Sequence, residues 1–210
     1  MHRVVIYLDF KCGIKPSQRI VNGSQAVPYS IPWQVSLFHY LPNGDFVHKC
    51  GGTIISPRHV MTADHCLGGP TDIYRIVVGL HSNNDTSGAV VHEICRYTKG
   101  GDHPRSDFSI VHLKKPIELG PRAIPACLPT VKMAGDFLAN KTMTASGWGA
   151  LQDDWLDGPF PNNLQFIKVQ GVTHEICKEM YSPAFHIRPD ELCATIGACY
   201  GDSGGKLLLE

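Results

Sequence analysis

The chain has 210 residues, enough for one compact β-protein or two small packed units. Its 19 Lys and Arg residues balance 19 Asp and Glu residues, so the net charge of zero argues against nucleic acid or an anionic membrane surface as a partner. No apolar stretch approaches the ~18 residues of a membrane span. Eight cysteines, with 43% hydrophobic residues, indicate an oxidising compartment and a real core.

The start of the chain gives mixed signals about export. Residues 4–8 form an apolar run that is too short for a good signal peptide, and Asp9 ends it, so the start is expected to be incomplete. N-glycosylation sequons at Asn22, Asn84 and Asn140 nonetheless agree with the cysteine count. We therefore predict a secreted, extracellular protein.

Short strands separated by turns are predicted from Ile31 onward. They are expected at residues 33–37, 52–55, 73–78, 90–94 and 108–113, with a turn at 42–45. A proline-bearing connection at 116–126 leads to a second β-rich stretch with strands near 144–149 and 164–172. Thr173 is predicted to N-cap a short helix that carries Ile176 and Met180 on one face. The spacing favours an all-β barrel or sandwich over βαβ units.

The pentapeptide Gly201-Asp-Ser-Gly-Gly205 is the most informative stretch. A hydroxyl that attacks a carbonyl must stand clear on a tight turn, with backbone N–H groups facing the developing negative charge, and glycines leave room for both. Ser203 is the candidate nucleophile, against the plainer alternative of a surface turn. No histidine follows Ser203, which excludes an α/β-hydrolase elbow, and no strong early acid motif supports the subtilisin order. The order histidine, acid, serine remains.

A second motif, Cys50-Gly-Gly-Thr-Ile-Ile-Ser-Pro-Arg-His-Val-Met-Thr-Ala-Asp-His65-Cys66, contains a histidine upstream of that serine. Together with Ile20-Val-Asn-Gly, Asp107-Phe-Ser-Ile-Val-His-Leu, Ser146-Gly-Trp-Gly and the glycine-rich pentapeptide, it resembles the chymotrypsin/trypsin-like serine endopeptidases. The resemblance implies an all-β fold of two six-stranded antiparallel barrels, the second incomplete, with a short intermediate helix. It implies a propeptide segment at 1–19 and a peptidase domain at 20–210, with barrels at about 20–120 and 121–210.

The same resemblance assigns the catalytic roles. His65 would be the general base, Asp107 the buried acid that orients its imidazole, and Ser203 the nucleophile that forms an acyl-enzyme. Asp64 and Asp102 are competing carboxylates, but Asp107 alone heads an apolar strand as the acid of the family does.

Activation is also implied by the family pattern. Arg19 and Ile20 would flank the zymogen cleavage site, and the freed Ile20 amine would pair with the carboxylate of Asp202. That pairing would order the oxyanion hole, formed by the N–H groups of Gly201 and Ser203, so an uncut chain should be nearly inert. Expected partners of this monomeric enzyme are polypeptide substrates, an activating protease and protein protease inhibitors.

Disulfides and specificity follow from the resemblance as well. It implies the pairs Cys50–Cys66, Cys177–Cys193 and Cys12–Cys127, which leave Cys95 and Cys199 over. Gly197 and the adjacent Ala198 stand at the floor of the specificity pocket, where trypsin-like members place an acid. Their lack of charge favours a chymotrypsin- or elastase-like preference for uncharged, apolar side chains over Arg or Lys.

Cofactors are not expected. Leu80 occupies the first ligand position of the calcium loop found in the family, and the His and Cys residues show no zinc spacing. No metal site is therefore predicted.

Several positions depart from the family pattern. The chain stops at Glu210 and has Lys206 in place of the usual proline, so we expect a fragment or a truncated variant. Asp64 replaces a small alanine and puts a second carboxylate beside His65, and Met143 replaces a common cysteine. These departures keep a second hypothesis open, in which the chain is a catalytically inactive or truncated homologue that acts as a binding or decoy protein.

Overall fold

The computed structural model describes residues 12–13, 24–101, 106–129, 135–151, 160–181, 186–188, 191–195, 202–205 and 207–209. In chain order its elements are β1 (Ser24–Gln25), β2 (Gln34–Tyr40), β3 (Phe46–Ser56), β4 (His59–Thr62), η1 (Asp64–Cys66), η2 (Thr71–Ile73), β5 (Tyr74–Val78), β6 (Val90–Lys99), β7 (Ser109–Leu113), η4 (Gly135–Leu138), β8 (Thr142–Gly147), β9 (Gln165–Val172), α1 (His174–Tyr181), β10 (Cys193–Ala194) and β11 (Leu207–Leu209).

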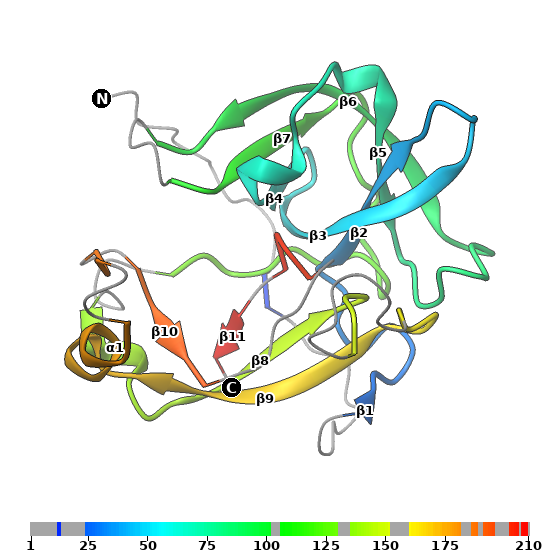
Figure 1. Cartoon of the computed structure of the whole chain (residues 1–210). Helices are drawn as coiled ribbons and strands as arrows, with labels where there is room; N and C mark the ends of the chain where they lie inside the picture. Colours follow the sequence, from blue (N-terminus) through cyan, green and yellow to red (C-terminus); the bar gives the residue numbers. More distant parts are fainter. Residues whose placement is uncertain are drawn as a thin grey trace.

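Six antiparallel strands close into a barrel in the order β2-β3-β4-β7-β6-β5 (Figure 1). Side chains alternate between the inside and the outside along each strand, as in β7, where Ser109, Val111 and Leu113 are buried and the residues between them are less so. The barrel interior is filled by aliphatic side chains, among them Val35 and Ile54, which are fully buried. The apolar residues whose alternation predicted the strands are thus the ones whose side chains fill the core.

The second sheet has the strand order β1-β9-β8-β11, with β10 also paired to β9. It does not close into a barrel within the described residues (Figure 1). The predicted fold class is therefore confirmed: in its described part the chain is mostly β, with one closed six-stranded barrel, an incomplete second sheet and one short helix. Strand β1 precedes the first barrel in the chain, yet Ser24 and Gln25 pair with Phe166 and Gln165 of β9.

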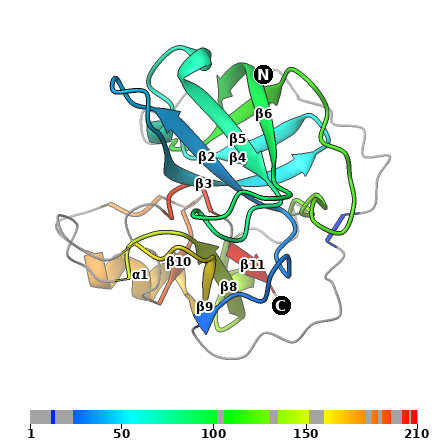
Figure 2. The ribbon, with the colours of Figure 1, turned by 90° about the vertical axis from the view of Figure 1, so that its right-hand side faces the viewer.

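The barrel and the second sheet lie against each other (Figure 2). A cluster of buried side chains, several of them large and aromatic, joins them. Trp33 and Phe38 come from the β2 region, while Trp148 and Phe166 come from the segments of the second sheet. Trp148 is fully buried, and its indole N–H donates to the carbonyl of His81 at 3.2 Å. Because the cluster contains buried rings from both halves, it holds the two halves together.

Helix α1 begins as predicted and packs differently from the prediction. The hydroxyl of Thr173 accepts a hydrogen bond from the Ile176 N–H at 3.3 Å, which is an N-cap. Ile176 and Met180, the predicted apolar face, are 49% and 72% exposed, whereas Cys177 is buried. The disulfide between Cys177 and Cys193 explains the difference, because it draws that side of the helix toward β10. No helix in the described part of the chain is long and apolar enough to cross a membrane.

Candidate active site

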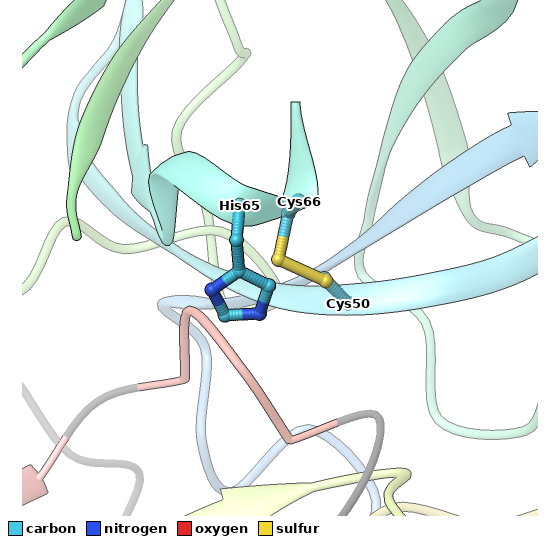
Figure 3. A group of neighbouring side chains, drawn as sticks. All are labelled: Cys50, His65 and Cys66. Atoms are coloured by element: carbon cyan, nitrogen blue, oxygen red, sulfur yellow. A yellow bond between two sulfur atoms is a disulfide. The ribbon is translucent and has the colours of Figure 1, made fainter. Parts of the chain in front are cut away.

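His65 lies on the short helical turn η1, directly after β4. The next residue, Cys66, is fully buried and forms a disulfide with Cys50 of β3, so the turn is linked covalently to the barrel wall (Figure 3). Potential ligand atoms of Cys50, His65 and Cys66 lie within 4.8 Å of one another. The two sulfurs are bonded to each other and offer no thiolate, so this group is suited to holding the turn and unsuited to a metal.

Asp107, which stands just before β7, holds His65 at two points. Its Oδ2 lies 2.6 Å from the ring Nδ1, and its Oδ1 accepts the backbone N–H of His65 at 2.9 Å. The expectation of a buried acid is wrong, because the side chains of His65 and Asp107 are 57% and 52% exposed. Asp107 precedes the first strand residue and so lies at the rim of the barrel, where water and salt screen its charge.

The segment 202–205 lies against the same part of the barrel (Figure 3). The N–H of Gly51 in β3 donates to the Ser203 carbonyl at 2.8 Å, and that carbonyl oxygen lies 4.0 Å from the sulfur of Cys66. The Gly205 N–H closes the turn by donating to the Asp202 carbonyl at 2.9 Å. Ser203 is thereby placed beside the turn that carries His65.

Gly204 explains why this turn requires glycine. Its φ is +80°, a conformation that L side chains rarely adopt. A Cβ at this position would also clash with the Thr62 hydroxyl and with the backbone of Gly51 and Ala63. The glycine therefore permits the close approach of the segment to the barrel.

Among the described residues, no hydrogen bond joins the imidazole of His65 to the Ser203 hydroxyl. The structure brings the histidine and the acid together directly, and it brings the serine alongside through its backbone carbonyl. Hydrogen bonds between a nucleophile and its base commonly tighten only in complexes with substrate.

The carboxylate of Asp202 points toward the second sheet. It accepts the Gly149 N–H at 2.8 Å, and side chains at Gly147 or Gly149 would collide with it. The other predicted positions of activation, the oxyanion hole and the specificity pocket lie outside the described residues: Arg19, Ile20, Gly201, Gly197 and Ala198. Asn22, Asp102, Cys199 and Lys206 lie outside them as well.

The three disulfides implied by the sequence are present: Cys12–Cys127, Cys50–Cys66 and Cys177–Cys193. Cys95 is an exposed free thiol on β6. Met143 is 1% exposed and Leu80 is 5% exposed, so each fills an apolar position.

Two residues that contact Asp64 were missed by the sequence analysis. The Asp64 carboxylate accepts hydrogen bonds from the Lys99 ammonium at 2.7 Å and from the Ser109 hydroxyl at 2.6 Å. The hydrogen bond from Lys99, and then that from Ser109, lower the pKa of this carboxyl from its ordinary value. No local motif signals these partners, because they come from β6 and β7 and meet Asp64 only in the closed barrel.

Comparisons with known proteins identify relatives of the chain. The family model described as Trypsin matches residues 20–210. Human chymotrypsin-like elastase family member 3B is 35% identical, over 92% of this chain and 73% of its own length. Proproteinase E of Bos taurus is 36% identical, over 92% of this chain and 78% of its own, and chymotrypsin-C of Mus musculus is 35% identical, over 91% and 72%.

Among solved structures, mouse neuropsin, a serine protease expressed in the limbic system of the brain, superposes with a TM-score of 0.75 at 24% identity. The match covers 91% of this chain and 83% of neuropsin, and it establishes the shared fold. The described site has a histidine and an acid joined at the barrel rim, with a glycine-flanked serine beside them. The chain also matches elastases and chymotrypsins. The chain belongs to the trypsin family of serine endopeptidases.

Proposed function

We propose that the chain is a secreted serine endopeptidase, made as a zymogen that is activated by cleavage after Arg19. Its proposed catalytic residues are His65, Asp107 and Ser203. The observation that carries the proposal is the pair of hydrogen bonds that the Asp107 carboxylate accepts from the ring and the backbone of His65. A carboxylate on Nδ1 orients the imidazole and leaves Nε2 to act as the base.

The proposed reaction proceeds through an acyl-enzyme. Nε2 of His65 takes the proton of the Ser203 hydroxyl while the serine oxygen bonds to the substrate carbonyl carbon. The imidazolium then delivers that proton to the leaving amine as the peptide C–N bond breaks. Water, deprotonated by the same imidazole, then attacks the carbonyl carbon of the ester. The bond between that carbon and the serine oxygen breaks, the imidazolium returns the proton to the serine, and the acid product leaves. The N–H groups of Gly201 and Ser203 would stabilise the oxyanion, each donor being worth ~3 kcal/mol of transition-state stabilisation.

The activation step concerns Asp202. In the uncut chain its carboxylate accepts the N–H of Gly149 and lies next to Gly147. After cleavage the new Ile20 amine would offer a stronger, charged partner to the same carboxylate. Because Asp202 directly precedes Ser203, a change of partner would move the segment that supplies the oxyanion hole.

The proposed specificity is for uncharged, apolar side chains. Gly197 and Ala198 bring no carboxylate to the predicted pocket floor, so an Arg or Lys side chain would find no counter-charge there. The relatives named as elastases and chymotrypsins fit this preference.

Secretion is proposed from the covalent chemistry of the chain. Three disulfides within the described residues require an oxidising compartment. The sequon residues Asn84 and Asn140 are exposed and so are accessible to a glycosyl transferase. The proposed partners are polypeptide substrates, an activating protease and protein inhibitors, with the enzyme acting as a monomer.

The structure also weakens the alternative of an inactive binding homologue. That alternative drew on the carboxylate of Asp64 beside the base, but this carboxylate is bonded to Lys99 and Ser109. It does not compete with Asp107 for the ring nitrogen.

Labelling with a serine-directed phosphonate tests the proposal. The full-length protein is expressed as a secreted zymogen, cleaved after Arg19 and incubated with the probe. We expect labelling of the cleaved protein, nearly none of an uncleavable Arg19→Gln variant and none of Ser203→Ala. Chymotrypsin serves as the positive control for the probe. If it reacts while the correctly folded, cleaved protein does not, the hypothesis of an active enzyme is wrong. Peptides that differ only at the residue before the cut would then test the preference for Leu, Phe or Ala over Arg.

A further inference from the structure

The Asp64 carboxylate lies where three elements of the barrel meet. Asp64 is the first residue of η1, the turn that carries His65. Its oxygens contact the Lys99 ammonium at the end of β6 and the Ser109 hydroxyl at the start of β7. The side chain of Asp64 is only 17% exposed, whereas that of Lys99 is 69% exposed. The carboxylate is therefore mostly buried, and the exposed side chain of Lys99 lies on its solvent side.

The strand register explains why these groups meet. Ser109 pairs with Lys99 across the β6–β7 ladder and with Thr62 across the β4–β7 ladder. Thr62 ends β4, two residues before Asp64, so the η1 turn rises directly beside the first residue of β7. Ser109 in turn follows Asp107 by two residues. The contact between Asp64 and Ser109 thus joins the segment of His65 to the segment of Asp107.

We propose that Asp64 is a positioning residue for the His65–Asp107 pair. Its carboxylate binds the turn of the histidine to the strand of the acid and forms, with Lys99, a neutral ion pair beside the imidazole. This inference rests on the proposed catalytic function. Its first consequence is geometric: loss of the tether frees η1 to move relative to β7 and loosens the two hydrogen bonds between His65 and Asp107.

The second consequence is electrostatic. The charged groups connected with the imidazole through described contacts are Asp107, which bonds to the ring, and Asp64, the residue before His65, with its partner Lys99. Removal of the Asp64 charge leaves the Lys99 cation unpaired and disfavours a protonated imidazole. Removal of the Lys99 charge leaves the Asp64 anion unpaired and favours it. A single charge several ångströms away in water-exposed surroundings corresponds to a shift of a few tenths of a pH unit.

The test compares Asp64→Ala, Asp64→Asn, Lys99→Met and the double variant Asp64→Asn with Lys99→Met. Each is made in the full-length protein and cleaved after Arg19. The readout is the second-order rate of phosphonate labelling as a function of pH. Glu93→Gln is the matched control. Glu93 is also on β6, six residues before Lys99, and it forms an ion pair with Lys114 at 3.1 Å.

We expect Asp64→Ala to lower the labelling rate about tenfold, and Asp64→Asn, whose amide oxygen can still accept from Ser109, to recover most of it. The acidic limb of the pH profile should move to lower pH in Asp64→Asn, to higher pH in Lys99→Met, and back to the wild-type position in the double variant. A merely structural tether would give no shifts of opposite sign. Glu93→Gln should change neither the rate nor the limb.

The outcomes are distinguishable. If wild-type protein labels and the Asp64 variants keep both its rate and its acidic limb, this inference is wrong while the proposed function stands. If folded, cleaved wild-type protein does not label, the proposed function fails and the inference fails with it. If Asp64→Ala does not fold, the opposite shifts of Asp64→Asn and Lys99→Met decide the matter.

Discussion

Asp107 holds His65 by the ring Nδ1 and by the backbone N–H, at 2.6 and 2.9 Å, although the two residues are 42 positions apart in the chain. A single hydrogen bond to the ring would orient the imidazole but leave its backbone free. The second bond fixes the backbone from which the imidazole projects. The acid therefore controls both the tautomer of the ring and its place at the barrel rim.

The first prediction concerns this contact. Asp107→Asn replaces a carboxylate oxygen with an amide, whose NH₂ group would donate to Nδ1 and leave the proton on Nε2. The base is then in the wrong tautomer, and we expect phosphonate labelling to fall by about 10²- to 10⁴-fold without loss of the fold. The exposed hairpin residue Asp45 provides the control, since Asp45→Asn should label like wild type. A rate within threefold of wild type for Asp107→Asn would contradict the assignment.

The second prediction separates backbone strain from steric clash. Gly204 and Gly44 have φ values of +80° and +89°, so alanine strains the backbone at both positions. Only at Gly204 does a Cβ meet neighbouring atoms, whereas nothing lies within 4 Å at Gly44. We expect Gly44→Ala to cost about 1 kcal/mol in urea unfolding and to label normally. Gly204→Ala should abolish labelling, and equal labelling rates for the two variants would refute the docking of segment 202–205.

The third prediction uses two disulfides of equal span. Cys50–Cys66 and Cys177–Cys193 each join residues 16 positions apart. Replacing either pair with alanines should therefore cost a similar ~3 kcal/mol in free energy of unfolding, by the loop-entropy relation. Labelling should fall only when Cys50–Cys66 is removed, because Cys66 directly follows His65 and anchors its turn. A similar fall for both pairs would mean that the effect comes from general destabilisation.

The fourth prediction concerns stability and pH. His59 and His112 face each other across β4 and β7, with ring centroids 4.8 Å apart. Burial lowers the pKa of both imidazoles, with a further contribution from Arg96. Below about pH 6.5 these two imidazoles bind more protons in the unfolded chain than in the folded chain. The free energy of unfolding should therefore fall as the pH is lowered through this range.

Urea unfolding of the uncut protein between pH 7.5 and 5 measures this effect. We expect the double variant His59→Asn with His112→Asn to show a flatter dependence than wild type. The hydrogen bond from Lys99 lowers the pKa of Asp64, so the stability that this carboxyl contributes is lost only below its ordinary range, outside the window measured. Identical slopes for wild type and the double variant would show that these two rings do not titrate differently on folding.

Much of the site could be predicted from local sequence because its requirements are local. A nucleophilic serine on a tight turn needs glycines around it, and Gly204 has the positive φ that only such a residue adopts readily. Alternating apolar residues predicted the barrel strands, since a strand with one face in a core repeats every two residues. Thr173 predicted the start of α1 because an N-cap lies within one turn of the helix it begins.

What the sequence determined by itself is therefore the strand pattern, the helix start and, by resemblance to a family, the identities of the catalytic candidates. Tertiary structure alone decided that Asp107 is half exposed, that Ser24 and Gln25 join the second sheet, and that Asp64 meets Lys99 and Ser109. Each of these depends on strand register and barrel closure, which bring together residues tens of positions apart. No local pattern encodes such distances, because they result from the packing of the whole barrel.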